Sequence, residues 1–329
     1  MKLHKILNQT TLTESPPIDD ILPLFHDDVN IPSLTGRLVY HRYNAYGDGS
    51  SRIYILDFIT GNLECISDSW TNVRDPMNAA WSADGTLIVF MGIDVKNGTW
   101  DIYLHKRGEN GNPVNLTNNA RTRDEDPKFK PGRNTKIVYK STDKNGYHIK
   151  TLSIPDNAIK IIYFDKTMEC SMPVYSHDGN TIYFAGFVRT NGEKDIFCVS
   201  AKGGSAEKVA GCAKPNVVEY YPIADKTGFF YSRNTPSSRA DQIYYKNTVT
   251  GNKPEPALFN IAGKDSSDAC IVDDNYIIIS SKRRGNKGGY DLYLCSIKTG
   301  EAWPLNLWND GVNTEREELG ACYTPANKR

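Results

Sequence analysis

Short charged segments recur along the chain, and each one directly precedes a strand-like apolar run. The clearest example is RDEDPKFKPGRNTKIVYKS, residues 123–141, in which an arginine and three acidic residues stand before a proline and an aromatic residue. Carboxylates can serve as acid and base, and a guanidinium group binds carboxylate or phosphate through paired hydrogen bonds. From these segments we select as candidate ligand-binding residues Arg74, Arg123, Asp126, Glu169, Glu219, Tyr220, Asp268, Arg316 and Glu317.

Three of these carboxylates, Asp126, Glu169 and Asp268, are also the candidates for acid–base catalysis. Asp126 and Asp268 each stand three residues before a hydrophobic marker, Phe129 and Ile271. A repeating structure would therefore hold them at equal depth on different repeats, as an acid and base pair requires. The alternative is a hydrated rim in which arginines and carboxylates only neutralise one another.

The chain contains an internal repeat of about 48 residues. NAAWSADGTLIVFMG (78–92), DPKFKPGRNTKIVYKS (126–141) and MPVYSHDGNTIYFAG (172–186) resemble one another, and weaker copies follow. The hydrophobic residue before each turn marks the period, at Trp81, Phe129, Tyr175, Ile223 and Ile271. A second marker, such as DIYLHK or DLYLCS, follows each copy. A fixed period of this length indicates a repeat architecture.

Each repeat predicts four short antiparallel strands joined by Asp-Gly and other glycine turns. Such units are the blades of a β-propeller, and a solenoid fits them poorly. The second marker occurs six times, whereas the first element occurs five times before residues 318–328 add a sixth copy. We therefore expect an all-β, six-bladed β-propeller at 37–329. Residues 318–325 should pair with the blade at 37–67 and close the ring, and residues 1–36 should form an arm outside the repeats.

Strand direction predicts which face carries the charged segments. Suppose that the first strand of each unit runs away from the charged face. The tight glycine turn that follows this strand then lies on the opposite face. The segments that enter each unit, and those that join its second and third strands, then meet on the charged face. We expect these segments to surround the mouth of a central channel.

The repeat resembles that of the TolB-like, or WD40-like (PD40), β-propellers. DPMNAAWSADGTLIVFMG followed by DIYLHKRGENGNPVNLT carries the resemblance, which extends over about residues 37–325. Similar repeats occur in TolB, in propeller domains of prolyl-oligopeptidase-like peptidases and in oligogalacturonate lyases. The Gly-x-Ser-x-Gly elbow of the peptidases is absent, and the six histidines do not cluster as they do at the lyase metal site. The resemblance thus implies the fold more strongly than a function.

Three functions remain open from the sequence. The first is a propeller that binds a small polar or anionic molecule, such as a sugar acid, in the charged funnel. The second is a lyase or cyclase that uses the acid–base residues of that funnel. The third is a scaffold for a protein partner, as in TolB. We expect neither a metal nor an organic cofactor, because no phosphate-binding loop, dinucleotide fingerprint or His-Glu-x-x-His motif is present.

The composition narrows the partners. The 329 residues contain 39 Lys and Arg against 39 Asp and Glu, which disfavours nucleic acid as a partner. No apolar run is long enough to predict a membrane span. The seven cysteines include no Cys-x-x-Cys pair, and the N-terminus does not resemble a secretion signal. We therefore predict reduced thiols and a cytoplasmic protein.

Overall fold

The computed structural model describes residues 30–188, 193–209, 211–212, 216–235 and 240–326. Residues 31–329 form one compact unit. Most of the predicted arm, residues 1–29, lies outside the described part of the chain. Within that part the secondary structure is almost entirely β-strand, with a short 3₁₀ helix η2 at Leu305–Leu307.

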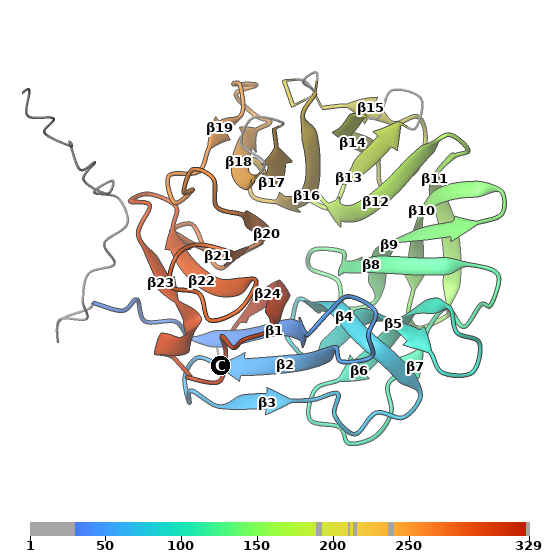
Figure 1. The fold of residues 1–329 in the computed structure, drawn as a ribbon. Coiled ribbons are helices and arrows are strands. Elements are labelled where there is room, and N and C mark those ends of the chain that lie inside the picture. The colour runs from blue at the N-terminus through green and yellow to red at the C-terminus, as the bar shows by residue number, and fades with distance from the viewer. Residues whose placement is uncertain (1–29, 189–192, 210, 213–215, 236–239, 327–329) are drawn as a thin grey trace, which may run out of the picture. The chain divides into compact units, whose positions relative to one another are not determined.

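The described strands form consecutive antiparallel units, which Figure 1 shows in chain order from blue to red. The first unit contains β1 (Gly36–Tyr43), β2 (Arg52–Asp57) and β3 (Leu63–Cys65). The second contains β4 (Val73–Trp81), β5 (Leu87–Asp94), β6 (Trp100–Lys106) and β7 (Val114–Asn115). The third contains β8 (Arg123–Phe129), β9 (Lys136–Asp143), β10 (Gly146–Ser153) and β11 (Ala158–Asp165).

The later units repeat this order. The fourth contains β12 (Met168–Tyr175), β13 (Thr181–Val188), β14 (Glu193–Ser200) and β15 (Glu207–Lys208). The fifth contains β16 (Val218–Ala224), β17 (Gly228–Asn234), β18 (Asp241–Asn247) and β19 (Glu255–Pro256). The sixth contains β20 (Ser266–Ile271), β21 (Tyr276–Ser281), β22 (Asp291–Ser296) and β23 (Ala302–Pro304). One parallel contact, between Lys194 and Val218, joins the fourth and fifth units into one sheet.

The last strand, β24 (Glu317–Pro325), pairs with the first unit. It lies antiparallel to β1, with Glu318 opposite Arg42 and Cys322 opposite Val39. The first unit thus gains its fourth strand from the far end of the chain. This pairing covers an edge of β1 that would otherwise present unpaired backbone groups.

Tight turns connect the first two strands of the second to sixth units. In the second unit, Asp84 Oδ1 accepts hydrogen bonds from Ser82 Oγ at 2.7 Å and from the Thr86 N–H at 3.0 Å. Gly85 follows with φ of +66°, a conformation that glycine adopts at little cost. The Asp-Gly pair therefore fixes this turn through a side-chain acceptor and a permissive backbone.

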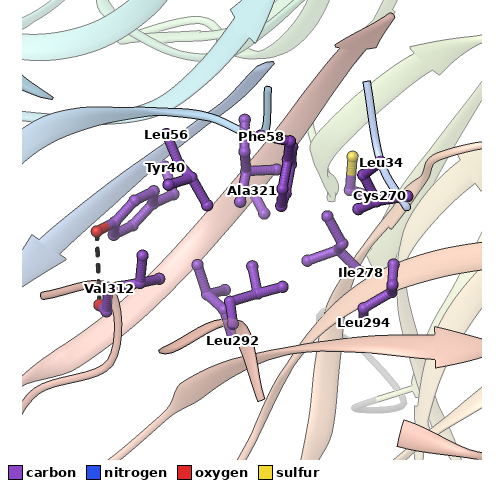
Figure 2. Packing of buried hydrophobic residues seen from close by; sticks show 12 residues of the cluster. Leu34, Tyr40, Leu56, Phe58, Cys270, Ile278, Leu292, Leu294, Val312 and Ala321 are labelled. Atoms are coloured by element: carbon purple, nitrogen blue, oxygen red, sulfur yellow. Dashed lines mark hydrogen bonds between the residues drawn. The ribbon is translucent and has the colours of Figure 1, made fainter. Parts of the chain in front are cut away.

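Hydrophobic clusters hold neighbouring units together, and each cluster combines residues from two of them. Figure 2 shows the cluster shared by the first and sixth units, where Tyr40 and Leu56 lie near Ile278 and Leu292. Each such fully buried side chain contributes about 1.5–3 kcal/mol relative to exposure. The interfaces between units are therefore the hydrophobic core.

One sequence alignment needs correction. The sequence repeat placed Ile223 of β16 in the same position as Phe129 of β8. In the structure Ile223 pairs with Phe230 of β17, and the corresponding pair in the third unit is Lys128 with Val138. The residue in the Phe129 position of the fifth unit is therefore Ala224. The turn that follows β16 is also shorter than the turns after β4, β8 and β12.

Candidate functional site

The innermost strand of each unit contains an irregularity at an equivalent position. In β8 the register shifts between Glu125 and Lys128, and in β20 it shifts between Ser267 and Cys270. One residue inside each irregularity has a positive φ, between +50° and +62°. These residues are Asn78, Asp126, Met172, Tyr221, Asp268 and Gly320.

A left-handed conformation costs an ordinary L-residue roughly 1–2 kcal/mol, and asparagine and aspartate tolerate it best. Met172 and Tyr221 lack that tolerance, so packing around them must offset the strain. A β-bulge re-aims a side chain out of the regular strand pattern. The irregular positions other than Gly320 thus each direct one side chain at a shared space.

That space is a cavity of about 390 Å³ lined by residues from all the described units. Its charged walls comprise Glu125, Asp126, Lys140, Glu169, Lys194, Asp241 and Asp268. Its aromatic walls comprise Tyr43, Tyr46, Tyr220, Tyr221 and Tyr290. Tyr46 and Tyr290 come from loops between the second and third strands of their units, so the cavity lies toward the predicted charged face.

The irregular positions also form the floor of this cavity. Asn78, Asp126, Met172, Tyr221 and Asp268 border both the main cavity and a second one of about 20 Å³. The second cavity has room for about one water-sized molecule. Residues with left-handed backbone thus lie between a cavity of ligand size and a much smaller one.

The two equivalent aspartates connect neighbouring inner strands. Asp126 Oδ1 accepts a hydrogen bond from Asn78 Nδ2 at 2.9 Å, and its Oδ2 accepts one from the Met172 N–H at 3.1 Å. Asp268 accepts hydrogen bonds from the Gly320 N–H at 3.3 Å and from Ser267 Oγ at 3.2 Å. Burial raises the pKa of Asp126, and it raises the pKa of Asp268 to about 6. Asp268 can therefore hold or release a proton near neutral pH.

A charged network lies on the wall formed by β8, β9 and β12. Lys140 Nζ lies 3.0 Å from Glu125 Oε2 and 3.6 Å from Glu169 Oε1. Arg123 Nη2 lies 2.7 Å from the other oxygen of Glu125. Burial alone would lower the pKa of Lys140, but Glu125 and Asp126 outweigh it and raise that pKa. Lys140 is thus a cation neutralised by its neighbours.

Lys194, at the start of β14, differs from Lys140. Among the described residues no hydrogen bond or ion pair joins its ammonium group, which lies 5.3 Å from the ring centre of Tyr220. The Tyr220 hydroxyl donates a hydrogen bond to Asp241. Burial lowers the pKa of Lys194. The cavity wall therefore contains a partly desolvated cation without a bonded anion.

The sequence-derived candidates divide into two groups. Asp126, Glu169, Tyr220 and Asp268 line the cavity together. The others lie elsewhere. Arg74 and Arg316 are exposed, and Arg123 is 47% exposed beside Glu125. Glu317 accepts a hydrogen bond from the Tyr290 N–H at 2.7 Å.

Glu219 is fully buried and forms an ion pair with Arg233 at 2.6 Å. The charged and aromatic cavity residues that were not selected from the sequence are Glu125, Lys140, Lys194, Asp241 and the tyrosines other than Tyr220. Lys194 directly precedes the strand marker DIFCVS, and this place is the signal that could have identified it.

Comparisons with solved structures identify the fold. TolB from Acinetobacter baumannii superposes with a TM-score of 0.68 at 15% identity, covering 89% of this chain and 68% of TolB. The β-propeller domain of the Trilobed protease from Pyrococcus furiosus gives 0.52 at 13% identity, covering 82% of each chain. This chain has a TolB-like β-propeller fold.

An oligogalacturonate lyase from Vibrio parahaemolyticus is similar to this TolB-like propeller with a TM-score of 0.55 at 14% identity, covering 82% of this chain and 78% of the lyase. No family model and no curated protein sequence matches the chain. At these identities the likeness establishes the fold and leaves the function to the site itself.

The described residues contain no group of three or more His, Cys, Asp or Glu side chains placed to hold a metal ion. They also contain no helix with the length and apolar character to cross a membrane.

Proposed function

We propose that this TolB-like propeller binds a small anionic molecule, a sugar acid or a similar carboxylate, in the central cavity. The observation that carries the proposal is Lys194, a cavity cation whose pKa is lowered by burial and which has no bonded anion among the described residues. A buried charge without a partner is costly, and a ligand carboxylate would supply one.

Three of the five cavity carboxylates, Glu125, Asp126 and Asp268, already have partners of their own, which supports the same ligand class. Glu125 has Arg123 and Lys140, and Asp126 has two hydrogen-bond donors. Asp268 is also bonded, and its pKa of about 6 leaves it partly protonated near neutral pH. The acidic residues therefore repel an anion less than their number suggests.

The remaining walls suit a small hydroxylated ligand. Tyrosine hydroxyls from several units can hydrogen-bond to ligand hydroxyls, while Met77 and Met91 provide an apolar surface. A volume of about 390 Å³ lies within the usual 300–1,000 Å³ range of small-molecule sites.

A thermal-shift screen against sugar acids, keto acids and aromatic acids, followed by calorimetry, tests this function. We expect Lys194→Met to weaken binding of the best acid at least tenfold, about 1.4 kcal/mol. Lys106→Met is the matched control, because Lys106 is exposed and pairs with Glu109 at 2.6 Å. Equal binding by wild type and Lys194→Met, or no binding of any acid, would overturn the proposal. In that case, a protein partner of the TolB kind becomes the leading alternative.

Asp268 favours a second candidate, a lyase or cyclase that uses acid–base chemistry. A carboxyl group with a pKa of about 6 can donate and accept a proton at neutral pH. The structural neighbour named as an oligogalacturonate lyase is compatible with a sugar-acid substrate. Turnover assays on each bound acid decide between binding and catalysis. Loss of turnover with retained binding in Asp268→Asn would establish the enzyme.

We also propose that the units form a closed ring of six blades. The support is the pairing of β24 with β1 and the hydrophobic cluster that the first and sixth units share. Deleting residues 317–329 should lower the melting temperature by 10 °C or more, on the order of several kcal/mol, because it exposes β1 and removes Ala321 from the core. Deletion of residues 327–329 alone is the control. A truncated protein that melts like wild type would contradict closure by β24.

A further inference from the structure

One of the irregular positions, Gly320 of β24, has no side chain to direct at the cavity. His41 of β1 fills the space beside it. A Cβ atom at position 320 would lie 2.6 Å from both Cε1 and Nδ1 of His41, far too close for a real contact. His41 lines the main cavity and is only 3% exposed. The imidazole ring of His41 therefore takes the place of the side chain that Gly320 lacks.

Three contacts fix the orientation of this ring. The Asn78 N–H donates a hydrogen bond to His41 Nδ1 at 3.3 Å. The ring of Tyr43 stacks on the imidazole with 5.6 Å between ring centres, and Gly320 lies against Cε1. Because Nδ1 accepts a hydrogen bond, the neutral ring carries its proton on Nε2. No described residue bonds to Nε2, so this N–H is the donor that His41 can offer to a ligand.

His41 is a neutral group at physiological pH. Burial lowers its pKa to about 3, and the positive charge of Lys128 acts in the same direction. Lys128 lines the smaller cavity on the other side of the floor. A neutral imidazole donates a hydrogen bond but brings no charge to attract an anion. His41 therefore differs in kind from Lys194, the cation of the cavity wall.

The two floor aspartates lie on either side of His41. Asp126 accepts a hydrogen bond from Asn78 Nδ2, and the Asn78 N–H donates to His41. Asp268 accepts a hydrogen bond from the Gly320 N–H, and Gly320 contacts the His41 ring. A ligand carboxylate at this point would meet both acidic groups, and like charges repel. A hydroxyl or carbonyl oxygen accepts a hydrogen bond here without that repulsion.

We propose that His41 Nε2 donates a hydrogen bond to a neutral hydroxyl or carbonyl oxygen of the ligand whose carboxylate Lys194 binds. This inference rests on the function proposed above and specifies its ligand as a monocarboxylic acid with a polar, uncharged second end. His41 belongs to β1 and Lys194 to β14, which lie on different sides of the centre in Figure 1. A ligand that spans the cavity can thus meet both residues.

Calorimetry with two matched acids tests this specificity. Gluconate and glucarate share a six-carbon chain, but glucarate has a second carboxylate where gluconate has its terminal hydroxyl. We expect wild type to bind gluconate about tenfold more tightly than glucarate, because of repulsion at the floor. His41→Asn keeps an acceptor for the Asn78 N–H but lacks the Nε2 donor. It should weaken gluconate binding about fivefold, the effect of one neutral hydrogen bond, and reduce the preference by the same factor.

The control is His177→Asn, because His177 is exposed on the turn after β12. This variant should keep both the affinity for gluconate and the preference over glucarate. Tighter binding of glucarate than of gluconate by wild type would overturn the inference, and so would an unchanged preference in His41→Asn.

A third acid isolates the hydrogen bond. 6-Deoxygluconate lacks the terminal hydroxyl, and wild type should bind it about fivefold more weakly than gluconate. His41→Asn should bind the two acids equally, because the donor is already missing. An equal loss in both proteins would show that His41 does not meet this hydroxyl, and the inference would fail.

Nuclear magnetic resonance of ¹⁵N-labelled histidine tests the donor without any ligand. The signals that disappear in His41→Asn identify His41, and at pH 7 they should report a neutral ring with its proton on Nε2. A charged ring, or a proton on Nδ1, would overturn this inference and leave the proposed function standing. If no acid binds, the proposed function and this inference fall together.

Discussion

Charged side chains between the strands of a unit form ion pairs, whereas the central cavity contains, within the described part of the chain, a charged side chain without a bonded counter-ion. Arg233 donates two hydrogen bonds to Glu219, at 2.6 and 2.9 Å, and its guanidinium lies 4.1 Å from the ring centre of Tyr244. Arg42 and Glu318 repeat this arrangement in the first unit at 2.8 Å. Lys194, in contrast, faces the cavity without a bonded anion among the described residues. Charges between strands are paired by the fold itself, so the unpaired charge indicates where a ligand would bind.

The largest expected effect comes from the paired region. Replacing Glu219 by Ala leaves the Arg233 guanidinium buried without its carboxylate, which typically costs 3–5 kcal/mol. Urea unfolding should show this loss in the free energy of unfolding. Asp274→Ala is the control, because Asp274 and Lys226 form an exposed pair that should contribute less than about 1 kcal/mol. A loss below 1 kcal/mol at Glu219 would remove the contrast between the two regions.

Glu219 and Tyr220 show what the sequence could not resolve. They are adjacent in VVEYY, and both were predicted to line the channel. Successive side chains of a strand point to opposite faces, so only Tyr220 reaches the cavity while Glu219 enters the interior of its unit. The periodicity identified the strand, but the choice of face depends on its register with the neighbouring strand, which the sequence pattern did not resolve.

Asp126 and Asp268 were more predictable. Their common distance from a hydrophobic marker placed them at one level, and the structure gives both the same left-handed conformation at the cavity floor. Lys128 left no comparable signal, and the only signal at Lys194 was its place before a repeated strand marker. A lysine on a strand is usually solvated, and only the packing of other units makes these two face the channel. Contacts between distant repeats are therefore the part that local patterns miss.

The next effect is smaller and concerns pH. Folded Asp268 keeps its proton up to about pH 6, whereas the unfolded chain releases it near pH 4. The folded state binds more protons in this window, so the contribution of Asp268 to the unfolding free energy falls as pH rises from 4 to 7. The full shift corresponds to about 2–3 kcal/mol. Urea unfolding at each pH measures the unfolding free energy of wild type and of Asp268→Asn. The difference between the two should change by this amount from pH 4 to pH 7.

Asp178 supplies the control of opposite sign. Hydrogen bonds from Ser176 and Asn180 lower its pKa to about 2, so its stabilising contribution is present above pH 4 and is lost as pH falls toward 2. The difference in unfolding free energy between wild type and Asp178→Asn should therefore change little between pH 4 and 7. If the difference in unfolding free energy between wild type and Asp268→Asn did not change from pH 4 to 7, the pKa of the carboxyl group at the cavity floor would be unshifted.

The smallest expected effect is at Arg123, which the sequence predicted to be one of the ligand-binding residues. Its guanidinium is 47% exposed, bonds to Glu125 and to the Tyr46 hydroxyl at 3.1 Å, and lies 5.3 Å from the ring centre of Trp100. Replacement by Ala removes these contacts but leaves Lys140 to neutralise Glu125 at 3.0 Å. We expect ligand affinity to fall by no more than about threefold, roughly 0.6 kcal/mol.

The comparison of Arg123→Ala with Lys194→Met by calorimetry locates the ligand. A cavity ligand loses its principal cation only in Lys194→Met, because Arg123 acts on the cavity through Glu125 and Tyr46 alone. A tenfold loss in Arg123→Ala with unchanged affinity in Lys194→Met would place the ligand on the outer rim. Lys194 would then have no role in binding the ligand, and the exposed arginines would be the groups that bind an anion.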